Sequence, residues 1–157
     1  MAKATRATAA LTQAGIDFAL HAYEYDPDVD RIGLAAAEAL GANPARVLKT
    51  LMVLADGKPA CVILPSDREI AMKKLAAALG AKSAAMMPPA QAEKLSGYKV
   101  GGISPFGQMR RVPVAIEASA MDWPRVFING GQRGLQVELS PADVVRLLGA
   151  VVAPVIA

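Results

Sequence analysis

The dipeptide Asp56-Gly57, set between two apolar runs, constrains the fold of this chain more than any other feature. Aspartate followed by glycine suits the two-residue turn that joins neighbouring antiparallel strands, because both residues tolerate a positive φ. The run over 47–55 is rich in Val and Leu, and the run over 60–64 is equally apolar. The pattern therefore predicts a β-hairpin whose two strands are largely buried.

Helical and extended patterns alternate along the rest of the chain. Segments of good helix formers that begin at a capping residue or end at glycine predict helices over 5–14, 34–40, 70–79, 88–95 and 140–148. Ser66 and Glu69 have the spacing of a capping box ahead of the helix over 70–79. Short strands are predicted over 17–24, 112–117, 126–129 and 135–139, and loops over 25–31 and 97–107. We expect one mixed α/β domain over residues 1–157.

Composition excludes several classes of protein. Aromatic residues make up 4% of the chain, so the core must be built from smaller apolar side chains and a base-stacking platform is hard to assemble. One cysteine, Cys61, and one histidine, His21, exclude a disulfide framework and a Cys/His zinc site. No segment approaches the roughly 18 apolar residues of a membrane span. These observations predict a cytoplasmic protein without a metal or a cofactor.

Two features indicate chemistry. Lys49 lies within the apolar run over 47–55, where its ammonium group must either reach solvent at the strand end or hold an anionic or carbonyl oxygen in a pocket. Gly101-Gly102 allow positive φ and a close backbone approach to a ligand, and their N–H groups can stabilise the oxyanion of an ester under attack. Glycine-rich turns and strand-end lysines are also common structural features, so both interpretations stay open on the residues alone.

Four segments resemble the YbaK/EbsC family in order and spacing. They are Lys49-Thr50-Leu51 after Asn43-Pro44, LAAALGAK over 75–82, GYKVGGISPFG over 97–107 and GGQRGLQVEL over 130–139. The resemblance covers nearly the whole chain and is greatest to the branch that hydrolyses Cys-tRNA(Pro). It implies a trans-editing domain related to the insertion domain of bacterial prolyl-tRNA synthetase, with a partly barrel-like mixed sheet flanked by helices. The implied partners are the acceptor end of tRNA(Pro) and, as a suggestion, prolyl-tRNA synthetase, with no membrane involved.

The same resemblance assigns roles to particular residues. Lys49 matches the family's essential lysine, and Gly101 and Gly102 match the loop whose backbone holds the aminoacyl carbonyl. In the cysteine-specific branch the substrate's own thiol attacks the ester, and no protein side chain is the nucleophile. The residues that the resemblance and the strand pattern place around the substrate are Tyr23, His21, Ile32, Thr50, Ser104, Pro105, Asn129 and Gln136.

Three points leave alternatives open. Asn129 and Gln136 stand where cysteine-specific relatives commonly have serine and aspartate, so such a pocket could prefer alanine or another small amino acid. The same pocket could serve a non-catalytic module that binds an aminoacyl end or a small metabolite. A hydrolase with Ser104 as its nucleophile is a third hypothesis.

The segment over 94–133 has six basic and two acidic residues and is predicted to steer the tRNA acceptor stem.

Overall fold

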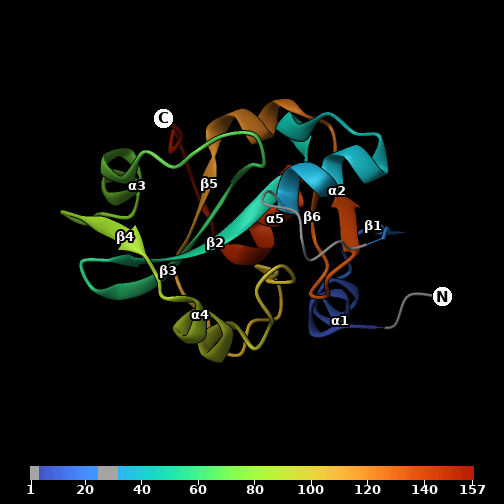
Figure 1. Cartoon of the computed structure of the whole chain (residues 1–157), viewed down its shortest axis with the longest axis horizontal. Helices are drawn as coiled ribbons and strands as arrows, with labels where there is room; N and C mark the ends of the chain where they lie inside the picture. Colours follow the sequence, from blue (N-terminus) through green and yellow to red (C-terminus); the bar gives the residue numbers. More distant parts are fainter. Residues whose placement is uncertain (1–3, 25–31) are drawn as a thin grey trace.

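The chain forms a mixed α/β structure in which short helices surround two small sheets (Figure 1). This computed structural model describes residues 4–24 and 32–157. Its helices are α1 (Arg6–Gln13), α2 (Ile32–Leu40), α3 (Met72–Ala78), α4 (Pro89–Ser96) and α5 (Pro141–Leu148), with 3-10 turns η1 (Pro44–Arg46) and η2 (Ala118–Asp122). Its strands are β1 (Phe18–Ala22), β2 (Leu48–Ala55), β3 (Lys58–Pro65), β4 (Ala84–Met86), β5 (Val114–Glu117), β6 (Val126–Asn129), β7 (Leu135–Leu139) and β8 (Val151–Ala153).

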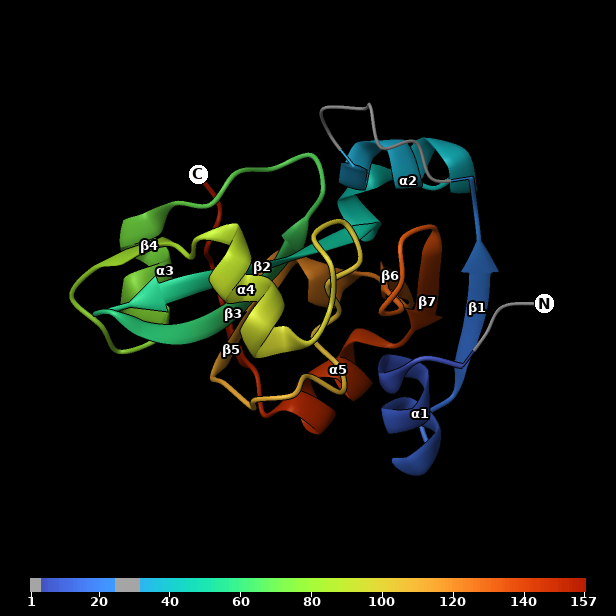
Figure 2. The same cartoon turned by 60° about the horizontal axis from the view of Figure 1, so that its bottom comes forward.

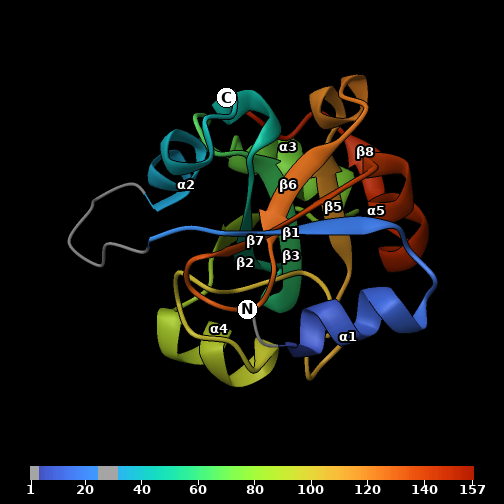
Figure 3. The same cartoon turned by 90° about the vertical axis from the view of Figure 1, so that its right-hand side faces the viewer.

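The described strands form two open sheets that meet at one point. The larger sheet has the order β4-β2-β3-β5-β8, and the smaller sheet has the order β1-β7-β6. A parallel bridge between Val47 and Phe127 joins the start of β2 to β6. Figure 3 shows the smaller sheet in front, with β2 and β3 of the larger sheet behind it. The mixed α/β class is confirmed. In place of the one partly barrel-like sheet that was expected, the described strands form two sheets joined by this bridge.

The predicted hairpin is confirmed. Asp56 and Gly57 have φ values of 49° and 78°, as a tight turn between antiparallel strands requires, and β2 pairs with β3 along its whole length. The Asp56 carboxylate also accepts hydrogen bonds from the main-chain N–H groups of Lys82 (3.1 Å) and Ser83 (3.0 Å), which lower its pKa. The turn residue therefore fixes the segment that leads into β4.

Of the other predicted elements, some are confirmed and some are wrong. The helices over 88–95 and 140–148 are confirmed, each ending at a left-handed glycine, Gly97 and Gly149. The capping box is wrong: α3 begins at Met72 without a side-chain cap, and the Ser66 hydroxyl donates instead to the Pro44 carbonyl at 3.1 Å. The three-residue edge strands β4 and β8 were not predicted. No helix in the described ranges is long and apolar enough to cross a membrane.

A buried carboxylate ties the C-terminal segment to the larger sheet. Glu117 is 3% exposed and accepts hydrogen bonds from the N–H groups of Ser119 (2.8 Å) and Val155 (3.0 Å). Burial raises the pKa of Glu117, but the hydrogen bonds from Ser119 and Val155 outweigh it and the pKa lies below its ordinary value of 4.5. The ionised carboxylate therefore stabilises the folded state above about pH 4.5.

Replacing Glu117 with glutamine is expected to destabilise the protein by about 2 kcal/mol at pH 7. The NH₂ group of glutamine cannot accept a hydrogen bond, so either the Ser119 N–H or the Val155 N–H would lose its acceptor. The depressed pKa sets the pH dependence. The difference in free energy of unfolding between the two proteins should shrink as the pH falls below 4.5 through the pKa of the folded state. Urea unfolding at pH 7 and at a pH below 4.5 measures this difference in free energy of unfolding. Glu38→Gln, at an exposed position of α2, is the control. A difference in free energy of unfolding between the wild type and Glu117→Gln that stays the same at every pH would contradict the expectation.

Candidate active site

A cavity of about 530 Å³ lies along the first half of β2. β4 pairs with β2 only over Val53–Ala55, so the described structure leaves the preceding edge of β2 without a neighbouring strand. The loop after α4 and the ends of β6 and β7 lie across this gap (Figure 2). The cavity is lined by Tyr23, Val47, Leu48, Lys49, Thr50, Leu51, Met52, Ser66, Glu69, Met86, Met87, Pro89, Ala92, Val100, Gly101, Ile103, Asn129 and Gln136.

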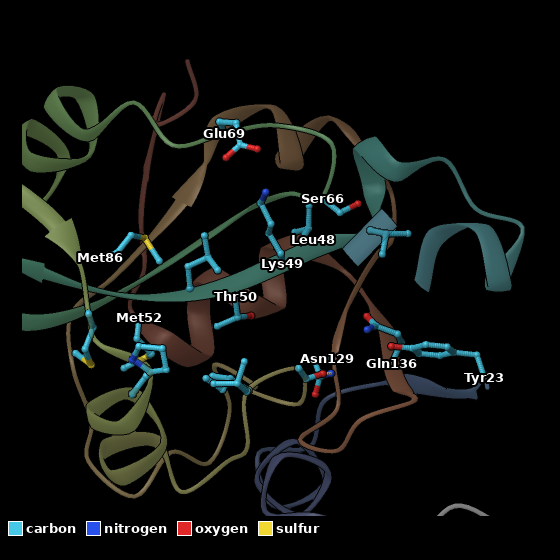
Figure 4. A pocket seen from close by; sticks show the side chains of 18 residues that line it. Tyr23, Leu48, Lys49, Thr50, Met52, Ser66, Glu69, Met86, Asn129 and Gln136 are labelled. Carbon is cyan, nitrogen blue, oxygen red and sulfur yellow. Dashed lines mark hydrogen bonds between the residues drawn. The ribbon is translucent and has the colours of Figure 1, made fainter. Parts of the chain in front are cut away.

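Lys49 and Thr50 face opposite ways from β2. Figure 4 shows Lys49 pointing to the side on which Glu69 and Ser66 lie, and Thr50 pointing to the other side. Lys49 is half-buried and lines the cavity, so it lies at a site where a ligand oxygen can reach an ammonium group. The Thr50 Oγ1 atom is buried and has no hydrogen-bond partner within the described ranges.

The two glycines of the predicted oxyanion loop differ from each other. Gly101 has φ 89° and lines the cavity, and its N–H has no hydrogen-bond partner within residues 4–24 and 32–157. The Gly102 N–H, in contrast, donates to the Lys99 carbonyl at 2.8 Å, and Gly102 does not line the cavity. A Cβ on Gly102 would lie 2.8 Å from the main-chain nitrogen of Arg133. The expectation that the N–H groups of both glycines converge on a ligand oxygen is therefore corrected, because only the Gly101 N–H is available to a ligand. Gly102 instead allows its loop to pack closely against Arg133.

Asn129 and Gln136 face each other across β6 and β7 at one end of the cavity. The Asn129 amide is fully engaged. Its Nδ2 donates to the carbonyls of Gly101 (3.2 Å) and Gln132 (3.4 Å), and its Oδ1 accepts from the N–H groups of Gly131 (2.7 Å) and Gln132 (3.2 Å). Gln136 is 4% exposed, and its Oε1 has no partner within the described residues. Figure 4 shows Tyr23 extending toward Gln136.

The structure places His21, Ser104 and Pro105 away from the cavity. His21 lies outside it, with Nε2 2.9 Å from Glu138 Oε1 and its ring against Phe127. Ser104 is 0% exposed and its Oγ accepts from the Phe106 N–H at 3.2 Å, so it is not accessible as a nucleophile. Pro105 is buried beside it and does not line the cavity. Ile32 opens α2, but its side chain lies outside the described part of the chain.

Sequence reasoning missed two polar residues of the site. Glu69 is an exposed carboxylate on the cavity wall, on the same side of β2 as Lys49 (Figure 4), and Ser66 lines the cavity nearby. The capping-box pattern predicted that both residues cap a helix, so neither was considered as part of the site. Cys61, in contrast, is a core residue as predicted: it is 1% exposed, and this burial raises the pKa of its thiol to about 12.

The basic residues of the segment over 94–133 do not all gather at the cavity. Lys99 and Arg133 are exposed next to the cavity wall, where Arg133 Nε donates to the Val100 carbonyl at 2.9 Å. Arg125, immediately before β6, does not line the cavity and pairs with Asp17 at 3.3 Å. Only part of the predicted basic surface is therefore close to the cavity. The described His, Cys, Asp and Glu side chains form no group that could hold a metal ion.

Helix α1 holds together the two loops that frame the cavity. The Thr5 hydroxyl, which caps α1, donates to the Gly130 carbonyl, and Arg6 Nε donates to the Gly107 carbonyl at 3.1 Å. A Cβ on Gly107 would lie 2.5 Å from the Arg6 carbonyl oxygen, so the contact is close. The start of α1 thus positions the 97–107 loop and the 130–134 turn relative to each other.

Thr5→Val is expected to lower kcat/KM for the site's reaction about tenfold, because small displacements of positioning groups are costly in catalysis. It also removes a helix cap worth about 1 kcal/mol. Thr8→Val is the matched control, since Thr8 accepts from the Thr5 N–H at 2.8 Å but does not contact Gly130. Steady-state kinetics with thermal unfolding separate the two effects, and equal losses of activity in both variants would contradict the positioning role.

Comparison with known proteins relates this chain to aminoacyl-tRNA editing. Residues 26–147 match the family model described as the aminoacyl-tRNA editing domain. The chain is 32% identical over 127 residues to EbsC of Enterococcus faecalis, which carries the name of a Cys-tRNA(Pro)/Cys-tRNA(Cys) deacylase; the match covers 80% of this chain and 77% of EbsC. It is 38% identical over 96 residues to the proline–tRNA ligase of Leptospira biflexa, covering 60% of this chain and 16% of the ligase.

A solved structure described as a trans-editing enzyme for prolyl-tRNA synthetase has the same fold. Its TM-score is 0.81 at 21% identity, and the match covers 97% of this chain and 95% of that one. The family match extends over most of this chain, and the named deacylase is similar over most of its own length. This protein is therefore a member of the aminoacyl-tRNA editing domain family and an aminoacyl-tRNA deacylase.

Proposed function

We propose that this deacylase clears cysteine from mischarged tRNA(Pro), using the thiol of the substrate as the nucleophile. The observation that carries the proposal is the similarity to EbsC, whose name assigns it Cys-tRNA(Pro) and Cys-tRNA(Cys), combined with a cavity whose described lining holds no activated protein nucleophile. No described lining residue is a cysteine or a histidine, Cys61 is a buried thiol with a pKa of about 12, and Ser104 is inaccessible.

The chemistry of an aminoacyl ester fits such a site. The sulfur of the cysteinyl group attacks the ester carbonyl carbon, a four-membered thioester ring closes, and the bond to the tRNA 3′-oxygen breaks. The 3′-oxygen leaves as a hydroxyl with the proton that the thiol gave up, and water then opens the ring to free cysteine. Because the ester is already activated, positioning and charge stabilisation suffice on the protein's side.

Two groups of the cavity have roles in this proposal. The Gly101 N–H donates to the carbonyl oxygen as negative charge develops there, which is the electrostatic stabilisation that one main-chain donor provides. The Lys49 ammonium binds the phosphate or ester oxygens of the tRNA acceptor end. The exposed side chains of Lys99 and Arg133 contact further phosphates of the acceptor stem, and prolyl-tRNA synthetase is the source of the mischarged substrate.

The experiment is a deacylation assay with tRNA(Pro) charged with cysteine, S-methylcysteine, alanine or proline. We expect Cys-tRNA(Pro) to be cleaved at least about 100-fold faster than the S-methylcysteine ester, because methylation removes the nucleophile and not the ester. Cys-tRNA(Cys) tests the dependence on tRNA(Pro). Similar rates for the cysteine and S-methylcysteine esters would refute the thiol mechanism, and no acceleration over spontaneous hydrolysis of the cysteine ester would refute the assigned substrate.

A further inference from the structure

The two ends of the cavity differ in their access to solvent. Asn129 and Gln136 are buried at one end, whereas Met86 and Val100, which also line the cavity, are 48% and 40% exposed. Figure 4 shows Met52 and Met86 together at the end opposite Asn129 and Gln136. The aminoacyl group is the outermost part of the tRNA acceptor end, so it enters first and reaches the closed end. The terminal nucleotide that carries it is then left at the open, methionine end.

The open end has a preformed apolar floor. Met52 and Met87 are buried and line the cavity, and the Met87 N–H donates to the Met52 carbonyl at 3.1 Å. The Met52 sulfur accepts a hydrogen bond from Gln108 Nε2 at 3.4 Å, and the same nitrogen donates to the Ser104 carbonyl at 3.0 Å. Gln108 therefore holds the Met52 thioether in one position at the cavity surface.

The walls of the open end are apolar side chains that solvent reaches. Met86 lies on the edge strand β4, and Val100 lies beside α4, where its N–H donates to Glu93 Oε2 at 2.8 Å. Exposed apolar side chains that border a cavity mark a surface that a ligand covers. The flat faces of a nucleobase suit this lining, because thioether sulfurs make favourable contacts with aromatic rings.

Two cations lie next to the same wall. Lys99 precedes Val100 and is exposed, and Arg133 Nε donates to the Val100 carbonyl at 2.9 Å. A nucleotide presents an aromatic ring close to an anionic phosphate, and this wall offers apolar side chains close to cations. The combination indicates a nucleotide within a phosphate-linked chain rather than a free apolar ligand.

We propose, building on the proposed function, that the open end of the cavity binds the nucleobase of the 3′-terminal adenosine of the tRNA, with Met52, Met86 and Met87 in contact with its ring. These contacts are the same before and during ester cleavage, so they strengthen binding of the substrate without speeding the chemical step. They do not depend on which amino acid the ester carries. The subsite therefore serves affinity for every aminoacyl-tRNA that the enzyme accepts.

Binding of uncleavable analogues tests the subsite apart from the chemistry. Acceptor-end RNAs carry cysteine or alanine on a 3′-amide in place of the ester, and each is made with a terminal adenosine and with a terminal ribose that lacks the base. We expect loss of the base to weaken binding about tenfold, as the loss of one stacked base does. Equal dissociation constants for the two forms, or no measurable binding of either, would overturn this inference, whereas cleavage of Cys-tRNA(Pro) would still support the proposed function. A preference for the base without cleavage of Cys-tRNA(Pro) would overturn only the cysteine assignment.

The variant Met86→Ala assigns the effect to the open end. It should weaken binding of the adenosine analogue about fivefold, because it removes apolar contact area, and change binding of the base-free analogue by less than about twofold. Met109→Ala is the matched control: Met109 is 65% exposed, lies against Gly97 and does not line the cavity, so both dissociation constants should stay unchanged. Equal weakening of both analogues, or wild-type binding of both, in folded Met86→Ala would overturn the assignment. Should that variant not fold, Val100→Ala is measured in the same way.

Discussion

Lys49→Ala is expected to lower single-turnover deacylation by at least about 100-fold while the protein stays folded, an effect of the size seen when one electrostatic group is removed from an active site. Lys49 lies on strand β2 and lines the cavity, so its ammonium can reach the oxygens of a tRNA acceptor end. It is half-buried and contributes little apolar packing, so the truncation should change the free energy of unfolding by less than about 1 kcal/mol.

The controls separate charge from geometry. Lys58→Ala removes an exposed lysine from the other end of the same hairpin and should leave both rate and stability unchanged. Lys49→Arg keeps the charge but changes the shape of the cation, so it should retain part of the activity. Single-turnover rates and chemical denaturation give the two quantities. A folded Lys49→Ala variant with the wild-type single-turnover rate would remove the lysine from the mechanism.

Features that depend on neighbours in sequence were predictable. Asp56-Gly57 defines its own turn because both φ values are set by those two residues, and the hairpin over β2 and β3 follows from it. Gly97 ends α4 for the same local reason. The cavity position of Lys49 agrees with the pocket interpretation of a lysine inside an apolar strand.

Features that depend on distant partners were not predictable. Ser66 fits a capping box locally, but the carbonyl of Pro44 takes its hydroxyl, and α3 begins several residues later. His21 alternates toward one face of β1, but Glu138 on β7 binds it outside the cavity. The edge strands β4 and β8 exist because β2 and β5 offer them hydrogen-bonding partners. The unmet acceptor of Gln136 is visible only once both neighbouring strands are in place.

The same dependence on distant partners makes Gly102→Ala the sharpest test of the loop. The new Cβ would lie 2.8 Å from the nitrogen of Arg133 and 3.1 Å from the carbonyl carbon of Gln132, and both are main-chain atoms that cannot turn aside. The 97–107 loop must therefore move away from the 130–134 turn, which displaces Gly101 from the Asn129 amide. We expect deacylation to fall about 100-fold, as displacement of a positioned group by about 1 Å can cause.

Gly57→Ala separates this positioning effect from a general loss of stability. Gly57 has φ 78°, and a Cβ added there would meet no atom within 4 Å beyond its chain neighbours, so alanine is strained at the hairpin tip without a clash near the cavity. It should cost about 1 kcal/mol of stability and leave kcat/KM unchanged. Gly102 does not have a positive φ, so the loss expected in Gly102→Ala comes from packing alone. If Gly102→Ala lost stability but kept the wild-type kcat/KM, the close contact of the two loops would not position Gly101 for catalysis, and the proposed mechanism would rest on Lys49.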